Sequence, residues 1–342
     1  MTERNQKLLS VAVPCYNSAA YMEKCVESLL HGGEDIEIIL VDDGSADETP
    51  AICDRYAGEY PDIIKAVHQP NGGHGDAINT GLKNATGLYF KVVDSDDWLD
   101  SPSLIQMISR LKAFEEPVDL IVCNYVYENA ADQKSRPIRY AGIMPENRVF
   151  TWEECRRFAP WQYLLMHAAC YRSELLKEAD LTLPKHTFYV DNVYVYQPLP
   201  FVKSICYLNL DLYRYFIGRA DQSINEKVMV SRANQQLSIT KIMIESHNIT
   251  GLKQGNPQLA RYMINYLSMM VSITTILFLL RDDSESYVNL RELWRFIKEC
   301  DKRLYRKLRY HSLAAFTSFP GRLGRRVVLS GYRAARSVFH FN

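Results

Sequence analysis

The sequence predicts an α/β fold with a mainly parallel central sheet, followed by a C-terminal region made only of helices. Up to about residue 127, short continuous apolar runs alternate with stretches whose apolar residues have helical spacing. That alternation is typical of strands covered by helices on both faces. From residue 228 onward, helical spacing alone continues,. The 342 residues, 47% of them hydrophobic, suffice for one large domain and an appended piece.

Strands and helices are expected in strict alternation. The predicted strands are residues 8–14, 36–41, 63–68, 88–93 and 120–127. The predicted helices are residues 20–30, 47–60, 76–85 and 101–114, the last with Ser101 as N-cap and Pro102 at its first position,. Residues 136–145 predict a loop. Since ligands bind at the carboxyl ends of parallel strands, the polar residues that follow these strands are expected to converge.

The helical region contains one segment that resembles a membrane span, because residues 262–280 carry no charge. The polar residues of the predicted helix 258–280 recur at intervals of three and four, which indicates one polar stripe on a packed amphipathic helix. They are Arg261, Asn265, Ser268, Ser272 and Thr275. A further helix is expected at 285–300.

Charge and cysteine content restrict the class of protein. Lys+Arg and Asp+Glu balance at 40 each, so nucleic acid is not expected as a partner,. From Lys302 to Asn342, however, there are ten Lys or Arg and no acid. This basic tail predicts either peripheral contact with an anionic membrane or a solvated helical cap. Eight scattered cysteines indicate neither disulfides nor zinc, and the short N-terminal apolar run predicts a cytoplasmic location,.

The strongest candidate site is the stretch from Tyr89 to Asp100, where an apolar run stops at three acids, Asp94, Asp96 and Asp97. Carboxylates so close together repel one another, which favours a bound cation. Mg²⁺ or Mn²⁺ takes one or two carboxylates and completes its shell with phosphate oxygens. A helix-capping turn is the structural alternative.

Two other strand ends carry weaker signals. Asp42 to Ser45 (DDGS) is good turn chemistry, but a carboxylate there could also bind a base or ribose,. Asn71 to Gly75 (NGGHG) is either a plain glycine loop or a backbone that approaches a nucleotide closely. No dinucleotide fingerprint or P-loop is present,.

Asp191 lies among aromatic residues, where partial desolvation should raise the pKa of its carboxyl, as a general base requires,. A solvated loop acid is the alternative. Further on, Arg214, Arg219, Gln222 and Ser223 could bind phosphate or sugar hydroxyls, or form a surface turn. Among the histidines, His74 and His167 are the two worth testing.

Taken together, four motifs resemble the inverting family 2 glycosyltransferases in their order and spacing, over about residues 8 to 225. The motifs are Val13 to Asn17 (VPCYN), Val41 to Ser45 (VDDGS), Asn71 to Gly75 with Asn79 to Gly81 (NGGHG and NTG), and Asp94 to Trp98 (DSDDW). The resemblance implies a GT-A fold at residues 1–225, with a nucleotide-sugar half (1–115) and an acceptor half (116–225). Residues 226–342 are the helical region with the basic tail.

The resemblance also implies a function, namely metal-assisted transfer with inversion of a hexosyl group from a nucleotide sugar, expected to be a UDP-sugar. The acceptor implied is a hydroxyl of a glycan or of a lipid-linked acceptor, as in cell-envelope polysaccharide biosynthesis. Asp191 is the implied general base and Asp96 the ligand of Mn²⁺ or Mg²⁺. The donor side comprises Pro14, Tyr16, Asn17, Asp42, Asp43, Asn71, Gly72, Gly73, Asp94 and Ser95. The acceptor side comprises Trp98, His167, Arg219, Gln222 and Ser223.

The chain departs from the family pattern in three ways. Val190 stands where many members have Glu before the base, and Ile78 stands where many have Arg before the Asn of the glycine-loop motif. The Q-x-x-R-W motif of processive synthases is absent, which favours addition of single sugars by a soluble or peripheral enzyme. Two alternatives remain open, a sugar-phosphate nucleotidyltransferase and a catalytically silent binding subunit.

Overall fold

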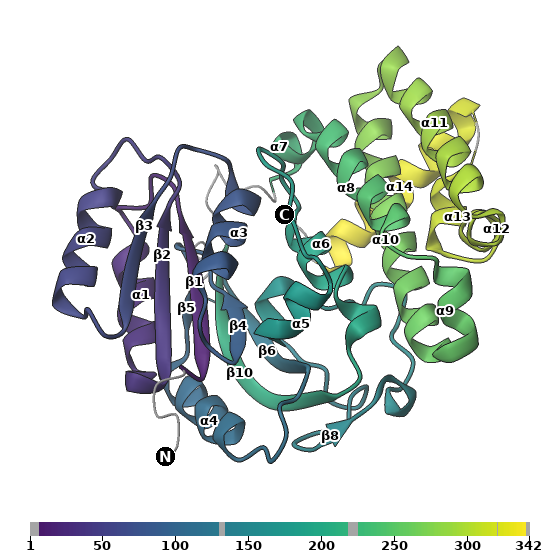
Figure 1. The fold of residues 1–342 in the computed structure, drawn as a ribbon. Helices are drawn as coiled ribbons and strands as arrows, with labels where there is room; N and C mark the ends of the chain where they lie inside the picture. The colour runs from purple at the N-terminus through teal and green to yellow at the C-terminus, as the bar shows by residue number, and fades with distance from the viewer. Residues whose placement is uncertain (1–6, 130–133, 218–224, 320, 340–342) are drawn as a thin grey trace. The chain divides into compact units, whose positions relative to one another are not determined.

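The computed structural model describes residues 7–129, 134–217, 225–319 and 321–339. The chain divides into two compact units, one formed by residues 1–156 with 164–217 and the other by residues 157–163 with 218–342. The first unit contains the sheet and the second is helical (Figure 1). The predicted boundaries at residues 115 and 225 stay predictions. The prediction did not group residues 157–163 with the helical region.

One mixed sheet organises the first unit, with strand order β3-β2-β1-β4-β9-β6-β10-β5. The main strands are β1 (Leu9–Cys15), β2 (Ile36–Asp42), β3 (Ile64–His68), β4 (Tyr89–Val92), β5 (Trp98–Leu99), β6 (Leu120–Asn129), β9 (Ala169–Arg172) and β10 (Ile205–Ile217). The first four pair in parallel, as expected. Strand β9 runs antiparallel to both β4 and β6, so the second half of the sheet is mixed.

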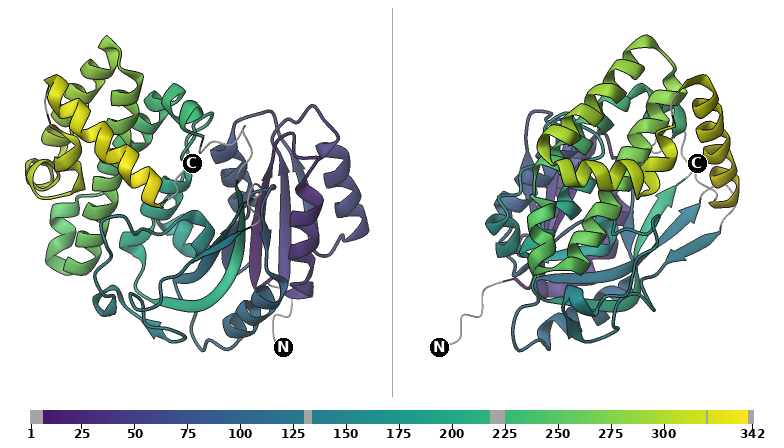
Figure 2. Two further views of the ribbon diagram at one scale, coloured as in Figure 1. Left: turned by 180° about the vertical axis from the view of Figure 1, so that it is seen from behind. Right: turned by 90° about the vertical axis from the view of Figure 1, so that its right-hand side faces the viewer.

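Apolar runs explain why the first half of the sheet is parallel and buried. All seven residues of β1 are buried, which requires helices on both faces. Helices α1 and α3 cover opposite faces of this region (Figures 1 and 2). The helices of this unit are α1 (Met22–Leu30), α2 (Thr49–Glu59), α3 (His74–Asn84), α4 (Ser101–Lys112), α5 (Ser173–Glu178) and α6 (Asp191–Tyr196), with short 3₁₀ turns η1 (Gly33–Asp35), η2 (Trp152–Glu154), η3 (Met166–Ala168) and η4 (Leu199–Phe201).

The structure corrects two local expectations. Residues Ser135–Ile138 form strand β7, paired with β6, where a loop is predicted from residue 136. The N-cap of α4 is Asp100 rather than Ser101, because the Asp100 carboxylate accepts a hydrogen bond from the Ser103 N–H. A short strand β8 (Val149–Phe150) also pairs with β10.

The second unit is a set of helices around α10 (Pro257–Arg281). The others are α7 (Glu226–Ser231), α8 (Ala233–Glu245), α9 (Ile249–Gly255), α11 (Ser284–Cys300), α12 (Lys302–Tyr310), α13 (Leu313–Thr317) and α14 (Gly321–Phe339). Helix α10 is long and apolar enough to cross a membrane, with a mean hydropathy of 1.9, but 67% of that apolar window is buried inside the protein.

Much of the polar stripe of α10 is buried against other helices and is not exposed to solvent. Ser268, Ser272 and Thr275 are all buried. The Ser268 hydroxyl accepts a hydrogen bond from the Ala314 N–H at the start of α13, and Thr274 pairs with Thr240 of α8 at 2.8 Å. These bonds satisfy hydroxyls in an apolar interior, so α10 has the properties of a packed core helix.

Candidate active site

The acidic turn lies between β4 and β5, and its three carboxylates have different surroundings. Asp97 is buried, and its carboxylate accepts hydrogen bonds from the Tyr213 hydroxyl at 2.6 Å and the Phe216 N–H at 2.8 Å. Burial, with Asp96 and Asp94 nearby, raises the pKa of Asp97 well above its usual value. Asp97 therefore fastens the turn to β10, while Asp94 and Asp96 are partly exposed.

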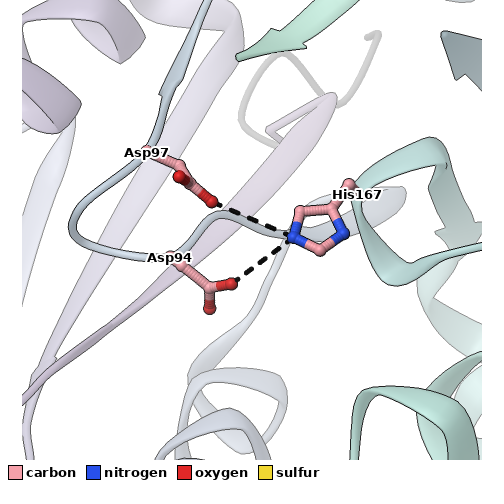
Figure 3. A group of neighbouring side chains, drawn as sticks. All are labelled: Asp94, Asp97 and His167. Atoms are coloured by element: carbon pink, nitrogen blue, oxygen red, sulfur yellow. Dashed lines mark ion pairs between the residues drawn. The ribbon is translucent and has the colours of Figure 1, made fainter. Parts of the chain in front are cut away.

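His167 faces this turn from η3, and its ring approaches two of the acids (Figure 3). Its Nε2 lies 3.8 Å from Asp94 Oδ2 and 3.9 Å from Asp97 Oδ2. The ring stacks on Tyr215 with centroids 4.2 Å apart. Within the described residues, neither buried ring nitrogen has a hydrogen-bond partner. Burial lowers the pKa of His167 to about 4, so the ring is neutral near pH 7 and offers a lone pair.

Lys91 is hydrogen-bonded to the backbone of the segment that carries His167. The side chain is buried, and its Nζ donates to the backbone oxygen of His167 at 2.7 Å and of Ala169 at 3.3 Å. Burial lowers the pKa of Lys91. A lysine inside the apolar run of β4 is thus the anchor for the segment that presents His167.

The glycine loop is shaped by Asp43 and joined to the acidic turn by His74. The two oxygens of Asp43 accept from the N–H groups of Gly72 and Gly73, each at 2.8 Å. Gly73 has φ 83°, a conformation that suits glycine. At the start of α3, His74 Nε2 lies 2.8 Å from Asp94 Oδ1. Burial opposes protonation of His74, but the charges of Asp94, Asp191 and Asp96 outweigh it and raise the His74 pKa.

The donor-side candidates at the ends of β1 and β2, and Ser95 of the acidic turn, differ in how far their side chains are exposed. Asp42 is buried, with its carboxylate 3.0 Å from His68 Nδ1 and accepting from the Ser45 N–H. Asn17 has φ 49°, and its side-chain oxygen accepts from the Ala46 N–H, joining the two strand ends. Pro14 is buried and Tyr16 is 56% exposed. Ser95 is buried and its hydroxyl bonds to that of Ser18.

Asp191 is presented by a loop that α3 holds in place. The Asn79 amide donates to the Leu183 oxygen and accepts from the Leu183 N–H, at 2.8 and 2.9 Å. Tyr189, two residues before Asp191, has φ 68°, an unusual conformation for a bulky residue. Burial raises the pKa of Asp191 to about 6, against the opposing effect of His74. The predicted direction of this shift agrees with the structure.

The comparisons with known proteins decide the family. The model of glycosyl transferase family 2 matches residues 10–178. The uncharacterized glycosyltransferase EpsJ of Bacillus subtilis is 36% identical over 51% of this chain and 50% of its own length. EpsH of the same organism is 28% identical over 72% of this chain and 70% of its own. These matches support a family 2 glycosyltransferase.

A solved structure supports the fold of this family 2 member. S. aureus TarS, residues 1–349 in complex with UDP-GlcNAc, superposes with a TM-score of 0.52 and 20% identity, covering 86% of this chain and 92% of the TarS chain. The predicted GT-A fold and the predicted family are therefore confirmed. The chain spans about half the length of EpsJ, and Asp191 lies beyond the region that the family model matches.

The acceptor-side candidates of the family 2 domain are only partly described. Trp98 lies under the Lys24 ammonium, 2.9 Å from its ring centroid, and beside the Phe216 ring at 6.2 Å. His167 lies at the acidic turn, as given above. Arg219, Gln222 and Ser223 lie outside the described residues. Arg214 forms ion pairs with Asp100 and Glu128, each at 3.0 Å.

The acidic turn has a donor set that fits a divalent cation. One ligand atom from each of Asp94, Asp97 and His167 lies within 4.8 Å of the others. The buried ring nitrogens of His167 make no hydrogen bond to any described residue, so a metal could take one of them. Carboxylates suit Mg²⁺ and Mn²⁺, and an imidazole favours the transition metal of the two. Asp96, the predicted ligand, is partly exposed on the same turn.

The sequence interpretation missed several residues that shape this site. Lys91 and Tyr213 are buried supports, and the sequence left the role of Asp97 open between support of a metal ligand and a place in the turn. A charged residue inside the apolar run of residues 88–93 is a signal that could have identified Lys91. Nothing in the local sequence links Tyr213 to Asp97, because the two are more than a hundred positions apart.

Proposed function

We propose that the chain transfers a single sugar, with inversion, from a UDP-sugar to a hydroxyl of a glycan or lipid-linked glycan. The observation that carries this proposal is the position of Asp191 at the start of α6, after a loop whose His186 N–H donates to the Gly72 oxygen at 2.7 Å; burial there raises the Asp191 pKa to about 6. A general base needs a pKa close to the working pH. Family membership supports the reaction class and makes the nucleotidyltransferase alternative the weaker one.

In this mechanism the chain's own groups position the reactants and move one proton. Asp191 accepts the proton of the acceptor hydroxyl, and the oxygen attacks the anomeric carbon from the side opposite the nucleotide, which inverts its configuration. The glycine loop, held by Asp43, offers backbone to the donor. The neighbouring carboxylates raise the pKa of His74, and its protonated ring would add positive charge beside the departing diphosphate.

A divalent cation, Mn²⁺ or Mg²⁺, would supply neutralisation of the charge on the departing diphosphate. Asp96 is the ligand that the family resemblance implies, and Asp94 and Asp97 of the same turn form a second set together with His167 of η3. Binding of Mn²⁺ to the Asp96→Ala and His167→Gln variants, followed by electron paramagnetic resonance, separates the two. The variant that loses at least tenfold in affinity has lost a ligand.

The function is tested by comparing Asp191→Asn with the wild type on UDP-GlcNAc, the donor bound by TarS, and on other nucleotide sugars. We expect transfer to fall about 10²–10⁴-fold in kcat, as for loss of a general base, while donor affinity changes little. Asp62→Asn, at an exposed position, is the matched control and should keep full activity. Transfer by Asp191→Asn at the wild-type rate would refute the assignment. Absence of transfer from every donor by the wild type would favour a silent subunit.

A further inference from the structure

The C-terminal helices expose apolar side chains that a solvated cap does not need. Four large ones come close together in the chain, and more than half of the surface of each is exposed. They are Phe316 (69%), Phe319 (53%), Leu323 (76%) and Val327 (56%). Scattered exposed apolar residues are ordinary, but a group of them on one short stretch marks a contact surface.

Helix α14 already has a buried apolar face, so its exposed Leu323 and Val327 form a second one. Val328 and Leu329 pack against Leu279 of α10 in a buried cluster. Arg325 fixes the same inner side, since it donates to the Leu279 oxygen at 3.1 Å and pairs with Asp282 at 3.0 Å. Figure 2 (left) shows α14, in yellow, on the outside of the helical unit. The outward positions Leu323 and Val327 are therefore not part of the core.

Basic side chains border these apolar positions. Leu323 and Val327 are four residues apart and lie on one side of the helix, with exposed Arg322 and Arg326 directly beside them,. From residue 302 to 342 there is no acid, so no carboxylate of this segment neutralises them. Apolar side chains flanked by arginines, whose stems can lie along apolar surface while their guanidinium groups reach phosphate, match the boundary layer of an anionic bilayer.

We propose that this surface, formed by Phe316, Phe319, Leu323 and Val327 with Arg322 and Arg326, docks the chain on an anionic lipid membrane. The helix lies on the membrane and does not span it. This deepens the proposed function, because docking would bring the enzyme to a lipid-linked acceptor, but docking itself requires no transfer.

The charge of the surface argues against a second copy as its occupant. A two-fold contact places the same patch against itself, so Arg322 and Arg326 of both copies would meet. Like charges brought together in this way repel one another. Anionic lipid headgroups instead complement the arginines, while the acyl region accepts leucine, valine and phenylalanine.

The proposal is tested with the full chain and sedimented vesicles, either of phosphatidylcholine alone or of phosphatidylcholine mixed with anionic phosphatidylglycerol. We expect binding to the anionic vesicles only, weakening as salt is raised. The double variant Leu323→Glu/Val327→Glu should bind at least tenfold more weakly, and Arg322→Gln/Arg326→Gln should lose most of the anionic preference. Ile105→Glu, at a 55% exposed position of α4 in the other unit, should bind as the wild type does.

Several results would overturn the proposal. The first is absence of wild-type binding to anionic vesicles. The second is binding by both double variants that equals binding by the wild type. The third is a wild-type dimer in solution that Leu323→Glu/Val327→Glu converts to a monomer. Circular dichroism confirms that each variant is folded, and the arginine variant, which leaves the apolar residues in place, provides an independent test. Release of nucleoside diphosphate from donor is measured in parallel. Vesicle binding without donor turnover would support docking and refute the proposed function. Donor turnover without vesicle binding would support the proposed function and refute docking.

Discussion

His74 Nε2 lies 2.8 Å from Asp94 Oδ1, and this contact joins the glycine loop to the acidic turn. His74 begins α3, and Asp94 lies two residues after the end of β4. Burial alone would raise the pKa of Asp94, but His74, His167 and Lys91 hold it below its usual value. Two motifs that are separate in the sequence therefore form one electrostatic unit.

The charge on His74 also bears on the proposed base. It lowers the pKa of Asp191, which burial raises to about 6. Because the base works as a carboxylate, the transfer rate should fall about tenfold per pH unit well below pH 6. In His74→Gln the stabilising cation is gone, so the acid limb of the kcat profile should move to higher pH. A limb that stays in place or moves to lower pH would contradict this coupling.

Asn79 should affect both stability and activity. Asn79→Ala removes both hydrogen bonds to Leu183 and leaves the loop that presents Asp191 without its clamp. We expect a loss of about 1–3 kcal/mol in the free energy of unfolding, measured with urea, together with reduced kcat. Asn84→Ala on the same helix is the control, because its side chain bonds to the Thr80 oxygen and to Lys65 rather than to the loop before Asp191. Equal effects of both variants would show that Asn79 is no clamp.

Gly81 marks a close approach of α3 to the sheet. A Cβ at this position would lie 2.5 Å from the Cβ of Ala12, so Gly81→Ala should destabilise the fold by about 1–3 kcal/mol despite the better helix propensity of alanine. Adding Ala12→Gly should recover part of that loss. Urea unfolding of the two single variants and the double variant gives the coupling energy. Strictly additive effects would mean that the two positions do not interfere.

Much of the first half of the fold could be predicted, because its strands are continuous apolar runs that end in polar turns. The second half could not be read in the same way. Ser135–Ile138 is exposed and contains Pro137, so its side chains show no strand periodicity. Strand β9 is set by its pairing with β4 and β6, which local sequence does not encode.

The candidate site shows the same division. The types of residue at the strand ends predicted the family and the chemistry. Their individual roles depend on partners far along the chain: Asp43 holds Gly72 and Gly73, and His167 meets the acidic turn from more than seventy positions away. The roles of Asp96 in metal binding and of Asp191 as base stay predictions until variants are measured.

Asp97 should act as a structural acid. Both oxygens of Asp97 accept hydrogen bonds, so Asp97→Asn, which keeps one acceptor oxygen, should retain part of the turn's hydrogen bonding near pH 7. Asp97→Ala, which leaves the Tyr213 hydroxyl and the Phe216 N–H unpaired, should lower the unfolding free energy by about 1–3 kcal/mol. Thermal and urea unfolding compare the two variants. If Asn were as damaging as Ala, Asp97 would be needed as a charged group.

The most direct test of the account is release of nucleoside diphosphate from a panel of nucleotide sugars, with Mn²⁺ and without acceptor. Slow donor hydrolysis needs only the donor side of the site. We predict release from at least one UDP-sugar by the wild type, and its loss in Asp96→Ala with Asp62→Asn unaffected. Neither hydrolysis nor binding of any nucleotide sugar by the folded wild-type chain would contradict the claim that this family 2 member is an active glycosyltransferase.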